Sequence, residues 1–172
     1  IYITTKDFEV YNKNYGDNRY ANPRNLASGC SRRLKSSEVA ECPLRIFVYE
    51  CFPENQIFSS HLENMIFMKE NGLPVNSYFG FFTSQNINEE LRDKINRAFP
   101  DSTIGNLQNA VEYLLKFSQI RKTLDYDIDG LVIKVNDIAL REKLGMTEHH
   151  PRWAIAYKFD APTAQTILKG VT

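Results

Sequence analysis

Two short segments near the C-terminal end of the chain each combine small side chains with a lysine. The first runs over 129–134 and ends at Lys134, and the second runs over 152–158 and ends at Lys158. In an extended strand, side chains alternate between two faces, so each lysine shares its face with small residues. These small residues are Gly130, Val132, Ala154 and Ala156. Such a face can accommodate a flat ring that carries a phosphate, because a binding pocket needs an apolar floor and a few placed charges. The pattern predicts a nucleotide site.

The opposite faces of the two segments are apolar, which is typical of a sheet face that packs on a core. They consist of Leu131, Ile133, Val135, Trp153, Ile155, Tyr157 and Phe159. Trp153 is therefore predicted to lie in the core rather than to stack on a base.

A second candidate site is the basic segment 19–35, which contains no acidic residue. In a helix that begins at residue 23, Arg24, Ser28 and Arg32 share one face. Two guanidinium groups on one slim face could clamp a phosphate, since their forked geometry matches phosphate oxygens. For a charge cluster alone, a solvated basic face is the more common outcome. Gly29 inside this helix costs roughly 1 kcal/mol relative to alanine, so it indicates close packing, a functional need or the end of the helix.

The composition mainly excludes classes of protein. The chain has 172 residues, 42% of them hydrophobic, and a formal net charge of zero, so it can bury a core and carries no global field for nucleic acid or membrane. No apolar run approaches the roughly 20 residues of a membrane span, and we see no signal-peptide pattern. The cysteines lack zinc-site spacing, and we expect a reduced, cytoplasmic protein. The sequence begins and ends within stretches where apolar and polar residues alternate, so we expect a piece of a longer protein.

Several helices and strands must position these residues. Asn22 is predicted to cap a helix that has proline at its first position, and Ser60 to begin another through a capping box. Further helices are predicted over 88–99 and 107–124, with Val111, Leu114, Leu115 and Phe117 as the buried stripe of the latter. Strands are predicted over 44–52, 126–135 and 153–159. This order predicts an α+β fold of largely antiparallel sheets flanked by helices.

Three motifs resemble the adenylation (nucleotidyltransferase) domain of bacterial NAD-dependent DNA ligases. They are Tyr-Ala-Asn-Pro-Arg-Asn-Leu-Ala-Ser-Gly (20–29), Asp-Tyr-Asp-Ile-Asp-Gly-Leu-Val-Ile-Lys-Val (125–135) and Pro-Arg-Trp-Ala-Ile-Ala-Tyr-Lys-Phe (151–159). They occur in the order of that family and at about its spacing, and the stretches at 140–147 and from 166 onward are also similar. The resemblance covers essentially the whole chain.

The resemblance implies a ligase that seals nicks in duplex DNA. In that family, a lysine in a Lys-x-Asp-Gly motif takes AMP from NAD, and the adenylate then passes to the 5′-phosphate of the nick, with Mg2+ (or Mn2+) assisting. The Lys-x-Asp-Gly motif is not present in these 172 residues, so we expect the piece alone to be unable to form the adenylate. The family also implies a monomer, with residues 1–165 as a partial adenylation domain and 166–172 as the start of the connection to an OB-fold domain.

Matching the motifs residue by residue implies specific roles. Lys134 and Lys158 match nucleotide-contacting lysines, Asp129 matches the acid of the metal site, and Arg24 the arginine of the Asn-Pro-Arg-Asn motif. Other matched positions are Arg32 and Arg121 near phosphates and Tyr49 beside adenine. The small floor residues Val132 and Ala156 are predicted to contact the nucleotide as well. Departures from the family pattern occur beside these positions, at Cys30, Ser31, Arg33 and Asp160.

Strict alternation places Asp129 and Lys134 on opposite faces, because they are five residues apart. Both can line one pocket only if Asp129 lies at a bend before the strand, which Gly130 would permit. Asp-Gly is also a common turn signal in its own right. Tyr49 could be a packed tyrosine rather than a ring that stacks on adenine, and adjacent histidines such as His149 and His150 are more often exposed than bound to metal.

Two other functions remain open. One is an ATP-dependent ligase or an RNA-capping type of nucleotidyltransferase, against which the Asn-Pro-Arg-Asn helix argues. The other is a non-catalytic nucleic-acid-binding module, which the basic segment 19–35 alone would permit.

Overall fold

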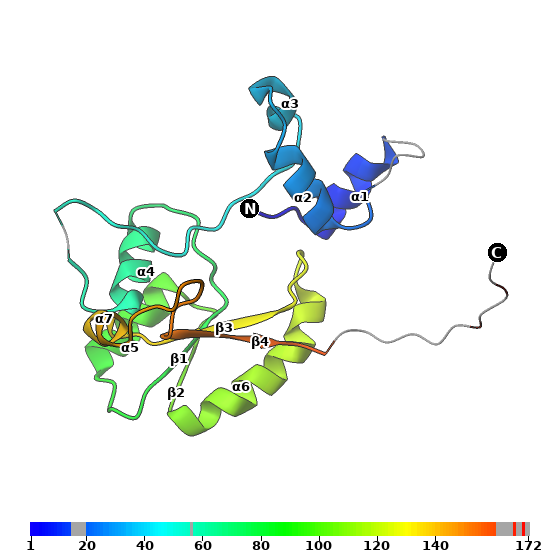
Figure 1. Ribbon diagram of the computed structural model, residues 1–172. Helices are drawn as coiled ribbons and strands as arrows, with labels where there is room; N and C mark the ends of the chain where they lie inside the picture. Colours follow the sequence, from blue (N-terminus) through cyan, green and yellow to red (C-terminus); the bar gives the residue numbers. More distant parts are fainter. Residues whose placement is uncertain (15–19, 56, 161–166, 168–169, 171–172) are drawn as a thin grey trace.

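The computed structural model describes residues 1–14, 20–55, 57–160, 167 and 170 (Figure 1). Its helices are α1 (Thr5–Lys13), α2 (Pro23–Ser31), α3 (Ser36–Ala40), α4 (His61–Glu70), α5 (Glu89–Ala98), α6 (Leu107–Ile120), the short 3-10 helix η1 (Arg121–Thr123) and α7 (Ile138–Leu144). Its strands are β1 (Gly80–Phe82), β2 (Thr103–Gly105), β3 (Gly130–Lys134) and β4 (Ala154–Lys158). The mixture of helices and strands agrees with the predicted α+β class.

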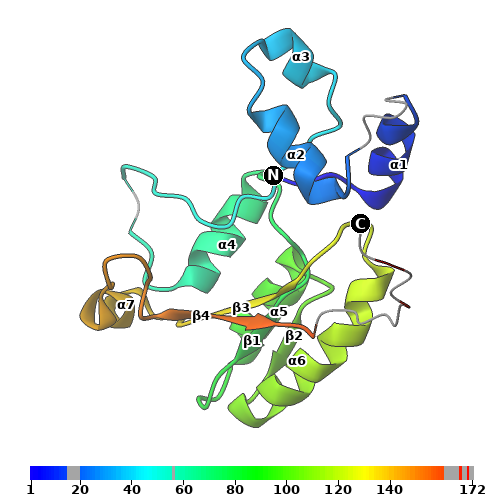
Figure 2. The ribbon, with the colours of Figure 1, turned by 45° about the vertical axis from the view of Figure 1, so that its right-hand side comes forward.

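The chain forms two packed parts, which Figures 1 and 2 show side by side. Helices α1–α3 lie apart from the rest and enclose a small core of Ile3, Leu26, Ala27, Cys30 and Cys42. The larger part contains α4–α7 and all four strands. Its main core lies between α4, α5 and the β1–β2 pair and consists of Leu62, Ile66, Met68, Val75, Ile95 and Phe99.

The predicted start of α2 is confirmed. Asn22 has an extended backbone, and its side chain accepts a hydrogen bond from the backbone N–H of Asn25 at 2.8 Å, while Pro23 occupies the first helical turn. Gly29 has a packing reason, because a Cβ atom there would lie 2.9 Å from the ring of Tyr20. The helix can therefore approach that ring closely only where it lacks a side chain.

The predicted capping box of α4 is also confirmed. The Ser60 hydroxyl accepts from the backbone N–H of Glu63, whose carboxylate accepts from the backbone N–H of Ser60 in return. Farther along α4, the amide of Asn64 bonds both the N–H and the C=O of Cys51, at 3.1 and 2.7 Å. One buried side chain thus fixes the path of the segment that precedes the helix.

The predicted strand over 44–52 is wrong. The structure gives this segment only an isolated bridge between Arg45 and Tyr2, and single bonds such as that from the Val48 N–H to the carbonyl of Pro74. Its β-branched and aromatic residues satisfy strand propensity, but its polar backbone groups find scattered partners rather than a continuous neighbouring strand. Strand propensity alone does not produce a hydrogen-bonded strand pair.

The expectation of largely antiparallel sheets is only half correct. The structure pairs β3 with β4 antiparallel, but β1 with β2 in parallel. The three-residue strands β1 and β2 were not predicted, because such short segments show no measurable alternation. They flank α5, which was predicted over 88–99 and which Asn88 caps in the structure.

The buried stripe predicted for α6 is partly wrong. Phe117 is buried, but Val111 and Leu115 are 61% and 60% exposed. The helix instead turns its aromatic residues inward, where Tyr113 packs against Phe82 of β1 with ring centroids 5.3 Å apart. The apolar residues of α6 are therefore spread over more of the helix surface than the face that packs on the core.

The core face predicted for the β3–β4 pair is also partly wrong. Trp153, Tyr157 and Phe159 are half-buried, but Ile133 and Ile155 are exposed. Both strands are shorter than predicted, with five residues each. Among the described residues, no helix is long and apolar enough to cross a membrane. Of the connection expected over 166–172, the structure describes only Ile167 and Gly170.

Candidate functional site

The register of β3 and β4 places both lysines on one face of the sheet. Gly130 lies opposite Lys158, Val132 opposite Ala156, and Lys134 opposite Ala154. Directly opposed residues of an antiparallel pair share a face. The two lysines therefore stand at opposite ends of one shallow floor, about 13 Å apart at a rise of about 3.3 Å per residue. The predicted shared face is present, although the lysines mark its two ends rather than meet at one point.

Asp129 lies at a bend immediately before β3, where the sequence required it. Its carbonyl accepts the backbone N–H of Phe159 at 2.9 Å, which continues the pairing by one residue. Its carboxylate Oδ2 lies 3.4 Å from Lys158 Nζ, and both side chains are 74% exposed. The bend thus brings Asp129 to the end of the floor that carries Lys158. An ion pair this exposed contributes little to folding, which leaves both groups accessible to a ligand.

Gly130 permits the close approach of the two strands at this end. A Cβ atom at Gly130 would lie 2.3 Å from the carbonyl oxygen of Tyr157. Any other residue would push β4 away and separate Asp129 from Lys158. Gly130 is thus needed for the close contact between the strands, as the first residue of β3, and not for a left-handed backbone at the bend.

Arg24 reaches the same end of the floor from α2. It lines a pocket of about 770 Å³ together with Ser28, Asp127 and Asp129, between α2 and the segment that leads into β3. Arg32 follows at the exposed C-terminal end of α2 and is not among the residues that line this pocket. Arg24 and Asp129 thus line one pocket, and Arg32 lies farther along the helix.

Arg121 lies beside the end of β4. Its guanidinium carbon is 4.8 Å from the centroid of the Phe159 ring, and one terminal nitrogen donates to the Asp160 carbonyl at 3.4 Å. Phe159 follows Lys158 directly, but its ring contacts Tyr157 on the other face of the strand. Arg121 therefore stands beside the end of β4 and not on the floor that carries Lys158.

The Lys134 end is built differently. Lys134 Nζ lies 4.9 Å from the centroid of the Tyr49 ring, within the range of a cation–π contact. Burial lowers the pKa of Lys134, nearby Arg141 lowers it further, and Glu50 opposes both. This lysine stays in a partly dry, aromatic environment.

Two residues around Lys134 were missed by sequence reasoning. Arg141 is 5% exposed and pairs with Glu50 at 3.1 Å. His61 lies near them, with Nδ1 3.8 Å from a Glu50 carboxylate oxygen, and burial together with Lys134 and Arg141 lowers its pKa to about 4. The imidazole is therefore neutral at physiological pH. His61 lies at the start of α4, outside the three motifs, and Arg141 lies between two of them, in the stretch 140–147. No local pattern assigned either residue a role.

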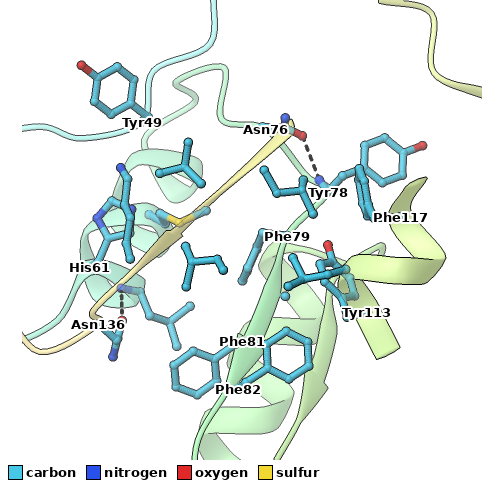
Figure 3. A pocket seen from close by; sticks show the side chains of 18 of the residues that line it. Tyr49, His61, Asn76, Tyr78, Phe79, Phe81, Phe82, Tyr113, Phe117 and Asn136 are labelled. Atoms are coloured by element: carbon cyan, nitrogen blue, oxygen red, sulfur yellow. Dashed lines mark hydrogen bonds between the residues drawn. The ribbon is translucent and has the colours of Figure 1, made fainter. Parts of the chain in front are cut away.

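A cavity of about 600 Å³ extends from this end of β3 into the larger part of the molecule (Figure 3). Tyr49 and His61 line it on one side, as Figure 3 shows, and aromatic residues of β1 and α6 line it on the other. These aromatic residues are Phe81, Phe82, Tyr113 and Phe117. Lys134 lines the cavity, whereas Lys158 does not. The cavity runs along β3 from Gly130 to Lys134, and Lys158 of β4 stands outside it.

Metal-binding residues are sparse in the part of the chain that the structure describes. It contains no group of three or more His, Cys, Asp or Glu side chains placed to hold an ion. Asp127 and Asp129 nevertheless line the same pocket as Arg24, and carboxylate oxygens are the ligands that Mg2+ prefers. Mg2+ keeps several waters and needs only one or two protein carboxylates, so this pair fits such an ion.

Comparison with known proteins agrees with the motifs. The family model of the NAD-dependent DNA ligase adenylation domain matches residues 1–162 of this chain. A DNA ligase of Borreliella burgdorferi is 39% identical over 161 residues, and one of Borrelia recurrentis 37%; each match covers 94% of this chain and 21% of the relative. A DNA ligase of Clostridium botulinum is 39% identical over 98% of this chain and 22% of its own length. The chain spans about a fifth of the length of these relatives, and it belongs to the family of NAD-dependent DNA ligase adenylation domains.

Proposed function

We propose that these residues are part of the adenylation domain of an NAD-dependent DNA ligase, which seals nicks in duplex DNA through lysyl-AMP and DNA-adenylate intermediates. The observation that carries the proposal is the single floor between two lysines, which is polar and open at Lys158 and aromatic and partly dry at Lys134. A nucleotide has the same polarity, with charged phosphates at one end and a flat base at the other.

The base would lie at the Lys134 end. Val132 and Ala156 face each other across the strands and provide a flat support, and the exposed Tyr49 ring can turn over the base. Stacking on an aromatic ring and an apolar floor does not depend on directional hydrogen bonds. This arrangement supports the roles proposed for Tyr49, Val132, Ala156 and Lys134 in binding NAD.

The phosphates would lie at the other end. Lys158 and Arg24 supply positive charge there, and phosphoryl transfer depends mainly on in-line positioning and on neutralising charge. Arg121, beside the end of β4, is proposed to contact a phosphate of the DNA. Asp129, with Asp127 beside it, would hold Mg2+. When bound, such an ion neutralises charge on the phosphate oxygens. Lys158 and Arg24 can then orient the α-phosphate toward the attacking lysine.

The attacking lysine is proposed to lie outside these 172 residues, because none of their lysines stands in a Lys-x-Asp-Gly motif. Within the protein that contains this chain, the described residues would supply the floor, the charges and the metal ligand. The remaining part would supply the nucleophile.

Contact with DNA is proposed for the exposed face of α2. Arg24 and Arg32 lie on or at the end of this helix in a segment without acidic residues. Arginine is suited to phosphate because its guanidinium group binds two oxygens at once. The same segment is the specific observation that favours a non-catalytic nucleic-acid-binding module, which is the second candidate.

A labelling experiment separates the two candidates. The full-length protein is incubated with Mg2+ and NAD that carries radiolabel in its adenylate group, and is then analysed by peptide mass spectrometry. We expect one AMP per protein on a lysine outside residues 1–172, and nicked DNA should discharge it. A protein that binds nicked DNA but never carries AMP would support the binding module instead. A stoichiometric adduct on a lysine within 1–172 would contradict the proposed division of roles.

A further inference from the structure

Arg141 of α7 makes three separate contacts that meet at the Lys134 end of the floor. Its Nε donates to the carbonyl of Val135, and one terminal nitrogen bonds the Glu50 carboxylate at 3.1 Å. Its guanidinium carbon lies 4.3 Å from the centroid of the Trp153 ring. With 5% of its surface exposed, Arg141 is the only buried charged residue in the described part of the chain.

Each of these contacts is made to the direct neighbour of a floor residue. Val135 follows Lys134, Glu50 follows Tyr49, and Trp153 precedes Ala154, the β4 partner of Lys134. Three segments that are remote in sequence are therefore joined by one side chain. Lys134 and Tyr49, which form the 4.9 Å cation–π contact, come from two of those segments.

We propose that Arg141 is a positioning residue that, through Glu50, holds Tyr49 and Lys134 in the geometry that receives the base of NAD. The inference rests on the proposed function. Arg141 itself does not line the cavity, so it acts through its neighbours rather than by touching the nucleotide.

A purely stabilising role explains the pair poorly. A half-buried ion pair gives little net stability, because taking both charges out of water costs about as much as their attraction returns. Geometry explains it better, since a planar guanidinium group can stack on Trp153 and bond Glu50 and a carbonyl in fixed directions at once. A lysine could not satisfy all three contacts together.

The charged groups of this cluster also surround Lys134. Lys134 is faced by Glu50, Arg141, the neutral His61 and the Tyr49 ring. Glu50 is shared between two cations, and its loss or the loss of Arg141 shifts the charge balance at Lys134 in opposite directions. The pair therefore sets both the position and the charge state of the lysine beneath the base.

The test measures single-turnover adenylation of the full-length protein across a range of NAD concentrations. Glu50→Gln and Arg141→Met should each raise the half-saturating NAD concentration about 10- to 100-fold, since small misplacements of binding groups have effects of this size. Arg141→Lys should restore only part of the loss. Arg45→Gln is the matched control, because it breaks the 2.8 Å ion pair with Asp7 in the α1–α3 part and should leave NAD binding unchanged.

A pH series distinguishes positioning from general loosening. Glu50 raises the pKa of Lys134 and Arg141 lowers it. Loss of NAD binding at high pH should therefore begin at lower pH in Glu50→Gln and at higher pH in Arg141→Met, relative to the unmodified protein. Shifts in the same direction, or none, would overturn the inference. If Arg141→Met fails to fold, Glu50→Gln and Arg141→Lys carry the test.

The outcomes separate the two levels of the proposal. An unmodified protein that forms no adenylate would overturn the proposed function and this inference with it. Normal half-saturation in Glu50→Gln and Arg141→Met, together with impaired binding in Lys134→Ala, would overturn the positioning role alone.

Discussion

The two ends of the β3–β4 floor carry the same residue type in opposite environments. Lys158 is 74% exposed and pairs loosely with an equally exposed Asp129, whereas Lys134 is half-buried beneath Tyr49 and beside a buried guanidinium group. The open end can exchange water for phosphate oxygens and a metal ion at little cost. The packed end is already partly dry and is shaped before a ligand arrives.

This difference indicates a division of labour between chemistry and recognition. Charged side chains that bind a reacting phosphate are best placed where they are exposed, because water and ligand can exchange there. A base is best bound by a preformed apolar pocket. It also separates two kinds of mutational effect. Changes at the open end should lower the rate of the chemical step, and changes at the packed end should weaken binding or stability.

The largest expected effect is that of Lys158→Ala in the full-length protein. Removing a cation that stabilises charge on the reacting phosphate should lower the rate of adenylate formation at saturating NAD by about 100- to 1,000-fold, with no change in melting temperature. Quench-flow measurement of the labelled adduct provides the rate. Lys116→Ala, which removes an exposed lysine of α6, is the control. Ordinary activity in Lys158→Ala would remove this lysine from the mechanism.

The packed end should respond to acid through His61. Its pKa is lowered from 6.5 to about 4 in the folded protein, so between pH 6.5 and pH 4 the unfolded state binds a proton that the folded state does not. Stability should fall by about 3 kcal/mol across that window as the pH decreases.

Substitution His61→Gln removes this contribution. Melting temperatures measured from pH 4 to pH 7.5 should therefore show a shallower acid loss in His61→Gln than in the unmodified protein. His149→Gln, which changes an exposed histidine, should keep the original slope. Parallel pH profiles for the unmodified protein and His61→Gln would mean that this imidazole is not desolvated.

Asp129→Asn should weaken the proposed metal site without disturbing the sheet, because the backbone pairing to Phe159 remains. Losing one anionic ligand should raise the Mg2+ concentration for half-maximal adenylation by about 10- to 100-fold. Titration of the adenylation rate with Mg2+ measures this, and Asp101→Asn at an exposed turn is the control. An unchanged Mg2+ requirement would assign Asp129 to the turn alone.

The smallest effects on stability are expected on α2. Arg24→Ala and Arg32→Ala should slow sealing of nicked DNA while shifting the melting temperature little, since exposed charges contribute about 0–1 kcal/mol. The neighbouring Arg33 provides the contrast, because it donates to the carbonyl of Glu38 and the hydroxyl of Tyr11 at 3.0 and 2.9 Å. Arg33→Ala should lower the melting temperature. If Arg32→Ala unfolds the domain and spares sealing, the phosphate role is wrong.

The local signals of the sequence were sufficient for the helix starts and for the shared lysine face. Asn22, Ser60 and Asn88 cap their helices through bonds that depend on residues three positions away, and alternation alone determines which strand residues share a face. Asp129 could be placed at a bend because the residue that follows is glycine. These are short-range constraints, which a single sequence contains.

What failed depends on contacts between distant segments. The segment 44–52 has strand propensity but no continuous strand partner in the described chain, and the parallel pairing of β1 with β2 joins residues more than 20 positions apart. The cluster of Glu50, His61 and Arg141 assembles from three such segments. Exposure of Val111 on α6 likewise depends on what packs against the helix. No periodicity encodes these choices.

The division between the two ends is tested most directly by comparing Lys158→Ala with Lys134→Ala in the full-length protein. The measurement is the single-turnover rate of adenylation as a function of NAD concentration. Lys158→Ala should lower the maximal rate and keep the half-saturating concentration within about threefold, while Lys134→Ala should raise the half-saturating concentration about tenfold and keep most of the maximal rate. The same pattern in both variants, or the reverse assignment, would contradict the separation of chemistry from base recognition.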